Sequence, residues 1–155
     1  MCLPERSEVY HNVMGTMTKL ALDVGCGDKL YQSNHPPGYD WVGTDKHDFS
    51  YLYEEGEFHQ HDLAAPFPFA PSMFDLVWCH HVLEHLPHRH PELDIDFAVW
   101  VVNGIYDVLK MGGEAHLIVP FKGHTNAWRA PHHYRFFDEN TFRWWSTSGK
   151  GLIAE

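Results

Sequence analysis

Short apolar runs alternate with longer, more polar segments along this chain of 155 residues. The runs end in turn-forming or acidic residues, and several are rich in β-branched and aromatic side chains. This pattern is typical of strands that are buried on both faces of a parallel sheet. We therefore expect strands at residues 20–24, 41–44, 57–61, 74–79 and 116–120.

The segment 91–110 has the pattern of a long amphipathic helix. It opens with Pro91, has acidic residues in its first turns, closes with Lys110, and is followed by the glycine pair 112–113. These are the residue types that begin and end helices. Apolar residues recur at spacings of three and four, which predicts one buried stripe. The stripe consists of Ile95, Val99, Val102, Tyr106 and Leu109.

A second helix is expected at residues 138–148, with Asp138 as its N-cap and with Phe142 and Trp145 toward the core. Strands that alternate with helices predict an α/β fold, in which a doubly wound, mainly parallel sheet has helices on both faces. We expect about six strands, the last starting at residues 151–154. The length predicts a single domain over residues 1–155.

The charge balance is acidic, with 21 Asp and Glu against 11 Lys and Arg and a net charge of −10. Nucleic-acid binders usually have a basic face, so we expect no nucleic-acid partner. No apolar run approaches the ~20 residues of a membrane span, and the first ten residues lack the layout of a signal peptide. A cytoplasmic protein without a membrane partner is the expectation.

Only three cysteines occur, Cys2, Cys26 and Cys79, and no CxxC pair is present. A disulfide framework or a cysteine-built zinc site is therefore not expected. Cys26 and Cys79 both follow or end predicted strands, so they are expected to lie near each other, but a functional disulfide between them is not favoured.

The first predicted strand ends in a glycine-rich turn that contains Asp23, Gly25 and Gly27. Glycines allow a sharp turn and let the backbone approach a ligand closely. The second predicted strand ends at Asp45, at a spacing from the turn at which an acid can accept hydrogen bonds from ribose hydroxyls. Together the two features predict a nucleoside-containing ligand, which neither predicts alone.

These segments resemble class I S-adenosylmethionine-dependent methyltransferases of the type 11, small-molecule kind. The matching segments are 21–27, 42–45, 62–63, 74–86 and 109–120, in the order and spacing of that family. The resemblance implies a Rossmann-like methyltransferase fold and a transferase that uses S-adenosyl-L-methionine and releases S-adenosyl-L-homocysteine.

The resemblance also implies which residues bind the cofactor. The residues expected at the methionine end of the cofactor are Asp23, Gly25 and Gly27, together with Cys26 in the same turn. Cys79 and His80 are expected beside the methionine end and the transferable methyl group. Those at the ribose are Asp45 and Lys46, and those at the adenine are Asp62 and Leu63.

Two departures from the family pattern change the expectation. Lys29 occupies a position where the family often has a third glycine. Both ends are short for the family, and no residues remain for its usual final antiparallel strand. We therefore expect a sheet truncated at its C-terminal edge. An exposed sheet edge invites pairing with another chain, so a homodimer is plausible.

Fourteen histidines are unusual for this length, and one group of them has a competing interpretation. His81, Glu84 and His85 form the HxxEH pattern of inverted zinc proteases, in which both histidines occupy one helical face. That pattern needs a longer helix, and Pro87 interrupts this one. Because the methyltransferase pattern explains the same stretch, we expect no metal ligands and treat His85 as a packing or capping residue.

The remaining histidines of interest follow the last predicted strand, in the aromatic loop that contains His132 and His133. Related enzymes often have a similar loop at the acceptor pocket. We expect methyl transfer to an oxygen or nitrogen of a small-molecule acceptor. The candidate bases are His81 and His132, and the secondary candidates are His80 and His124. The alternatives are a catalytically inactive, cofactor-binding partner subunit and the zinc hydrolase of the HxxEH pattern.

Overall fold

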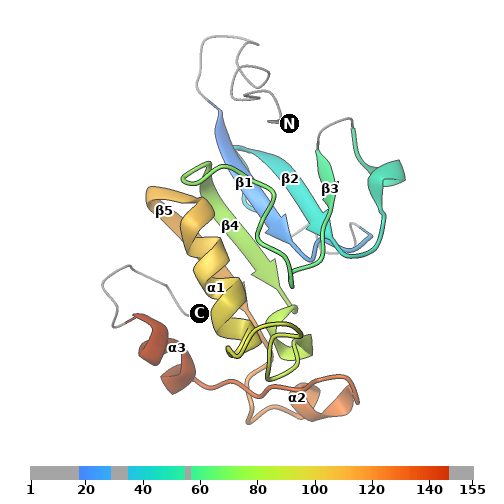
Figure 1. Cartoon of the computed structure of the whole chain (residues 1–155), viewed down its shortest axis with the longest axis vertical. Helices are drawn as coiled ribbons and strands as arrows, with labels where there is room; N and C mark the ends of the chain where they lie inside the picture. Colours follow the sequence, from blue (N-terminus) through green and yellow to red (C-terminus); the bar gives the residue numbers. More distant parts are fainter. Residues whose placement is uncertain (1–17, 29–34, 55–56, 147–155) are drawn as a thin grey trace.

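The computed structural model describes residues 18–28, 35–54 and 57–146, without the side chains of 143–146. The described part contains one five-stranded parallel sheet in the order β3-β2-β1-β4-β5 (Figure 1). The strands are β1 (Lys19–Val24), β2 (Tyr39–Asp45), β3 (Phe58–Gln60), β4 (Phe74–His80) and β5 (Leu109–Ile118). The predicted α/β architecture is confirmed, and the sixth strand expected at 151–154 lies outside the described residues.

The two central strands carry the core, as their continuous apolar sequence predicts. In β1, Leu22 and Val24 are fully buried, and in β4, Phe74, Val77 and Cys79 are fully buried. Direct pairing of β1 with both β2 and β4 places the polar residues that follow these strands at one edge of the sheet.

Helix α1 (Phe97–Val108) crosses one face of the sheet in front of β4 and β5 (Figure 1). It begins six residues later than Pro91 because Asp96 caps it, accepting hydrogen bonds from the backbone N–H groups of Ala98 and Val99. The predicted stripe is therefore wrong in phase, and of its members only Val102 is buried. The buried face consists of Phe97, Ala98, Val101, Val102, Ile105 and Val108.

Strand β5 begins at Leu109, directly after α1, and not at residue 116 as expected. The pairing of β4 with β5 is irregular between Phe74 and Leu76, where Leu76 faces Glu114. Gly112 has a φ of +77°, a conformation that glycine adopts without strain. The glycine pair thus belongs to a bulge inside the strand and does not terminate the helix.

Two further helices follow β5, α2 (Thr125–Arg129) and α3 (Glu139–Ser146). Asp138 caps α3 as predicted, because its carboxylate accepts the N–H groups of Asn140 and Thr141. Phe142 is buried as expected, whereas the side chain of Trp145 lies outside the described part. The sequence pattern missed α2, which is a single short turn.

In the described part of the chain, no helix combines the length and the apolar character that crossing a membrane requires. The sheet edges in this part are β3 and β5. Pairing of two copies through an edge, the single domain over 1–155 and the cytoplasmic location remain predictions.

Candidate functional site

The glycine turn lies where the strand order of the sheet reverses. From β1 the chain proceeds outward through β2 and β3 on one side, and β4 and β5 lie on the other side. In open α/β sheets, ligands bind outside the carboxyl ends of the strands at such a switch point. The turn after β1, the end of β2 and the end of β4 therefore border the same candidate site.

Two glycines shape the turn in different ways. Gly25 has a φ of +69°, and a Cβ built on it would collide with the side chain of Val82. Gly27 has a φ of +56°, but a Cβ built there would meet no atom of the described residues within 4 Å. The backbone N–H of Gly25 donates to the carbonyl of Thr44 at 2.7 Å, which ties the turn to β2. Gly25 thus allows close packing behind the turn, and Gly27 faces open space.

Asp45 links the end of β2 to the glycine turn. One carboxylate oxygen accepts the N–H of Gly27 at 3.2 Å, and the other accepts the N–H of His47 at 2.9 Å. A carboxylate has about four lone-pair positions, so it can accept further hydrogen bonds at both oxygens. The two hydrogen bonds thereby fix the orientation of the carboxylate at the turn.

Asp23 lies beneath the turn and is 6% exposed. Its carboxylate is 2.9 Å from Nε2 of His35, whose ring stacks on Trp41 at a centroid distance of 3.7 Å. Sequence analysis missed both partners, since no spacing rule relates a loop histidine to an acid in the preceding strand. Because His35 already engages Asp23, a ligand ammonium group would have to share this carboxylate.

The two cysteines of the described part are free and buried. Burial raises the pKa of Cys26 to about 12, and burial likewise raises the pKa of Cys79 well above its ordinary value. Both are therefore thiols at neutral pH and are poor nucleophiles. Both side chains pack in the interior, and Sγ of Cys26 lies where a side chain on Gly43 would be.

The residues expected at the ribose and adenine lie around the open side of the turn. Lys46 and Asp62 are exposed, and Leu63 is partly buried. The carboxylate of Asp62 accepts the N–H of Ala64 at 2.9 Å, which shapes the loop after β3, and the carbonyl of Leu63 accepts the indole N–H of Trp100. Asp62 thus has a fixed orientation and an oxygen to spare for a ligand.

His81 follows β4 with a φ of +56°, a left-handed conformation that is strained for a non-glycine residue. Its Nδ1 lies 2.7 Å from a carboxylate oxygen of Glu84, which is 1% exposed. His80 stacks against His81 at 4.4 Å, and burial lowers the pKa of His80. The buried carboxylate orients the ring of His81 at the tip of β4.

The HxxEH geometry of a zinc protease is not present. His81 lies outside the 3₁₀ turn η4 (Leu83–His85) and bonds to Glu84, so the two histidines do not share a helical face. His85 instead contacts the ring of His132, stacked at 4.8 Å, and that of His133, edge-on at 4.8 Å. Burial lowers the pKa of His85, and the nearby Glu84 carboxylate opposes this effect.

The two predicted bases therefore belong to different histidine groups, His81 with Glu84 and His132 with His85 and His133. His124 has a structural role, since its ring accepts the N–H of Asn126 and caps α2. The sequence did not indicate the second group, because its members come from segments that are far apart in the chain.

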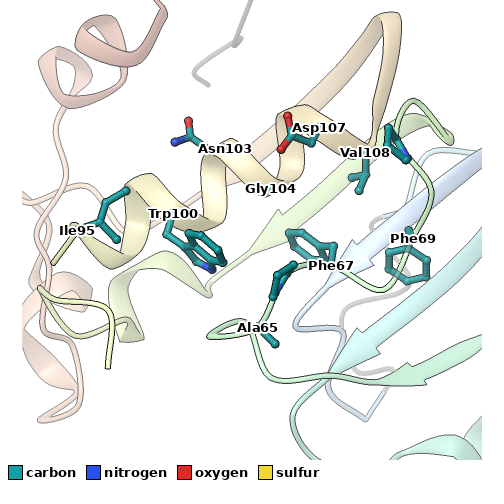
Figure 2. A pocket seen from close by; sticks show the side chains of 11 residues that line it. Ala65, Phe67, Phe69, Ile95, Trp100, Asn103, Gly104, Asp107 and Val108 are labelled. Carbon is teal, nitrogen blue, oxygen red and sulfur yellow. The ribbon is translucent and has the colours of Figure 1, made fainter. Parts of the chain in front are cut away.

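A groove of about 290 Å³ lies away from the glycine turn, between α1 and the loop after β3 (Figure 2). Phe67, Phe69 and Trp100 line it, and Phe67 packs so close to Gly104 that a Cβ there would overlap its ring. Asp107 is its one acidic lining residue. The groove carries neither the glycine turn nor a histidine group, so we do not assign the cofactor to it.

A doubly wound sheet with a glycine turn and an oriented acid at its switch point defines a nucleoside-binding class of α/β domain. The sequence model of a family described as a methyltransferase domain matches residues 22–117. The chain therefore belongs to this family, that of class I S-adenosylmethionine-dependent methyltransferases. A comparison with curated proteins gave no match.

Solved structures agree with the fold. The YcgJ protein of Bacillus subtilis is 18% identical with a TM-score of 0.63, over 84% of this chain and 60% of that one. A candidate methyltransferase from Bacillus halodurans is 19% identical with a TM-score of 0.63, over 84% and 62%. An S-adenosylmethionine-dependent methyltransferase from Archaeoglobus fulgidus is 18% identical with a TM-score of 0.59, over 81% and 57%. The chain thus spans about three fifths of their length.

Proposed function

We propose that this domain binds S-adenosyl-L-methionine at the carboxyl ends of β1, β2 and β4 and transfers its methyl group to a small-molecule acceptor. The observation that carries the proposal is the link between the open glycine turn and Asp45, whose carboxylate accepts the N–H of Gly27 at 3.2 Å. This link lies at the switch point of the sheet, where such domains bind their ligands.

The residues of the turn fit this cofactor. The left-handed φ of Gly27 and the open space beside it leave the backbone accessible to a ligand. Asp45 would hold the ribose hydroxyls, with Lys46 beside it, and Asp62 and Leu63 would frame the adenine. The methionine end would lie along the turn from Asp23 to Gly27, beside Cys79 and His80, at the ends of β1 and β4.

The bound cofactor would supply a methyl group already activated by its sulfonium, so the protein has to align the acceptor and remove a proton where the acceptor has one. His81 is suited to that proton transfer. Since the Glu84 carboxylate can only accept a hydrogen bond, the proton of the neutral ring lies on Nδ1, and Nε2 carries the lone pair that takes up a proton. No carboxylate contacts His132 in the described part, so His81 is the stronger candidate.

The surface near the histidines favours a small acceptor over a nucleic acid. The net charge of −10 would repel phosphates. Helix α2 and the loop after it instead expose aromatic side chains, with Trp128 63% and Tyr134 51% exposed and with Phe136 stacked on Trp128 at 3.9 Å. Aromatic side chains with a few polar groups are typical of small-molecule sites.

Calorimetric titration of the full chain with S-adenosylmethionine tests the cofactor site. Replacing Asp45 with alanine should weaken binding about 10- to 100-fold, since hydrogen bonds to a charged group contribute about 1.5–3 kcal/mol. Asp48→Ala is the matched control, because Asp48 is an exposed acid that also accepts a nearby backbone N–H, that of Ser50. Equal affinities in the wild type and Asp45→Ala would refute the ribose assignment.

A panel of small metabolites with a labelled methyl donor tests the transfer step. We expect label to appear in at least one oxygen or nitrogen acceptor, and we expect His81→Ala to abolish transfer while cofactor affinity is retained. Cofactor binding without transfer to any acceptor would instead identify the domain as an inactive binding partner. The absence of cofactor binding would refute the proposal as a whole.

A further inference from the structure

Three imidazole rings lie close together in the segments that follow the carboxyl ends of β4 and β5. His85 belongs to η4, and His132 and His133 belong to the loop after α2. One ring nitrogen from each of the three histidines lies within 4.8 Å of the other two. His85 and His133 are half-buried and His132 is exposed, so solvent can reach the group.

Backbone carbonyls fix the orientation of two of the rings. Nδ1 of His133 lies 2.9 Å from the carbonyl oxygen of Ala127, and Nδ1 of His85 lies 3.3 Å from that of His132. A carbonyl can only accept, so both Nδ1 atoms carry the proton and each Nε2 has its lone pair available. This is the arrangement by which metal-binding histidines are commonly held, with one nitrogen on a carbonyl and the other toward the ion.

The loop with His132 and His133 is fastened to the segment that carries His85. The N–H groups of Tyr134 and Arg135 both donate to the carbonyl of Glu84. The Arg135 guanidinium, 10% exposed, donates to the carbonyls of Leu86 and Pro87 and to both carboxylate oxygens of Asp96, at 3.0 and 2.9 Å. The two segments thus hold the histidines together before any ligand arrives.

We propose that His85, His132 and His133 form a zinc site. Neutral imidazole is a preferred ligand of Zn²⁺, and three histidines leave a fourth position open for water or an anionic oxygen. Zn–N bonds of about 2.0–2.1 Å in a tetrahedron place the nitrogens roughly 3.3 Å apart, so the rings must close by a small rotation. His132, as the exposed member, is the ring that can rotate most freely.

The buried Glu84 carboxylate adds a favourable charge. Glu84 directly precedes His85 in η4, and the second oxygen of its carboxylate has no hydrogen-bond partner in the described part of the chain. Negative charge next to neutral imidazoles favours a cation. The site does not depend on the proposed methyl transfer, because its ligands are neither the residues assigned to the cofactor nor His81, the stronger candidate base.

Calorimetric titration of the metal-stripped full chain with zinc chloride tests this site. We expect one ion per chain, and we expect His132→Ala to weaken binding at least about tenfold. Since His132 is exposed, the variant should fold, which circular dichroism checks. Cobalt(II) should give the visible absorption of a tetrahedral site in the wild type and lose it in the variant.

The matched control is His88→Ala, which removes another exposed histidine from the same region of the chain. It should bind zinc as the wild type does, which separates a defined site from general adsorption to the many histidines. The proposal is overturned if the wild type binds no stoichiometric zinc or if His132→Ala binds it equally well. Since zinc and S-adenosylmethionine are titrated separately, failure of one proposal leaves the other tested on its own.

Discussion

The glycine turn after β1 and the histidine group near η4 are assembled in opposite ways. The turn uses backbone conformation and one acid from the next strand, so its contacts are those of neighbouring strands. The histidine group instead joins residues 47 positions apart, and hydrogen bonds of one arginine hold its two segments together. A site built from strand ends can therefore be predicted from the sequence, whereas a site built by the packing of distant loops cannot.

The largest effect is expected within the glycine turn. Gly25→Ala should lower the free energy of unfolding by about 3 kcal/mol, since it combines a left-handed φ with a collision against Val82. Gly27→Ala has the same kind of φ, but its methyl group would contact none of the described residues, so it should cost about 1 kcal/mol. Urea unfolding of both variants measures the difference.

If the two glycine variants were equally stable, the view that Gly25 serves packing and Gly27 serves the ligand would be incorrect. Gly27→Ala should in addition weaken S-adenosylmethionine binding, because its new methyl group would occupy the open side of the turn. This pair therefore separates packing from ligand access within one turn.

Several of these features follow from the sequence because strands buried on both faces leave short apolar runs, and because topology fixes the side of the sheet at which ligands bind. The presence and order of the five described strands, the turn from Asp23 to Gly27 and the position of Asp45 were predicted on this basis, but the start of β5 was not. The start of α1 was not predicted, because Pro91 and Asp96 are both residue types that begin helices, and the Arg135 guanidinium that contacts Asp96 comes from a distant loop.

The contacts of the histidines were also beyond sequence analysis. The pattern HxxEH suggested that His81 and His85 share a helix, yet the left-handed φ of His81 separates them. The pairing of Asp23 with His35 and that of His85 with His132 depend on how loops pack, and packing has no period along the chain. The residues that sequence analysis placed best are accordingly those that strands position.

An intermediate effect is expected at the anchor of the histidine loop. Arg135→Ala should lower the free energy of unfolding by about 2 kcal/mol, since it removes several hydrogen bonds of a largely buried guanidinium. It should also weaken zinc binding while the affinity for S-adenosylmethionine stays unchanged. Chemical unfolding and the two titrations measure these effects.

Arg129→Ala, an exposed arginine at the end of α2, serves as the control and should change stability by less than about 0.5 kcal/mol. An equal loss of both affinities in Arg135→Ala would contradict the separation of the two regions. Loss of zinc binding alone would show that the histidine loop is positioned independently of the glycine turn.

The smallest effect is a pH dependence carried by Asp96. Burial would raise the pKa of this carboxyl group, but hydrogen bonds from Arg135 and from the α1 backbone outweigh it and lower the pKa. Because the pKa is lower in the folded state, the ionised group stabilises the fold above the unfolded value of about 3.9, and this contribution is lost as the pH falls through the lowered pKa.

Asp96→Asn retains a capping side chain but removes the charge, so it should be less stable than the wild type at neutral pH by at most about 1 kcal/mol, since Asp96 is 42% exposed. The difference should be constant above about pH 5 and shrink toward pH 2. Asp94→Asn, which alters an 89% exposed acid paired with Arg89, should differ little from the wild type at any pH. If the difference in the free energy of unfolding between Asp96→Asn and the wild type were the same at pH 2, the carboxylate would act by its shape and not by its charge. The ion pair of Arg135 with Asp96 would then not hold the histidine loop by electrostatic attraction.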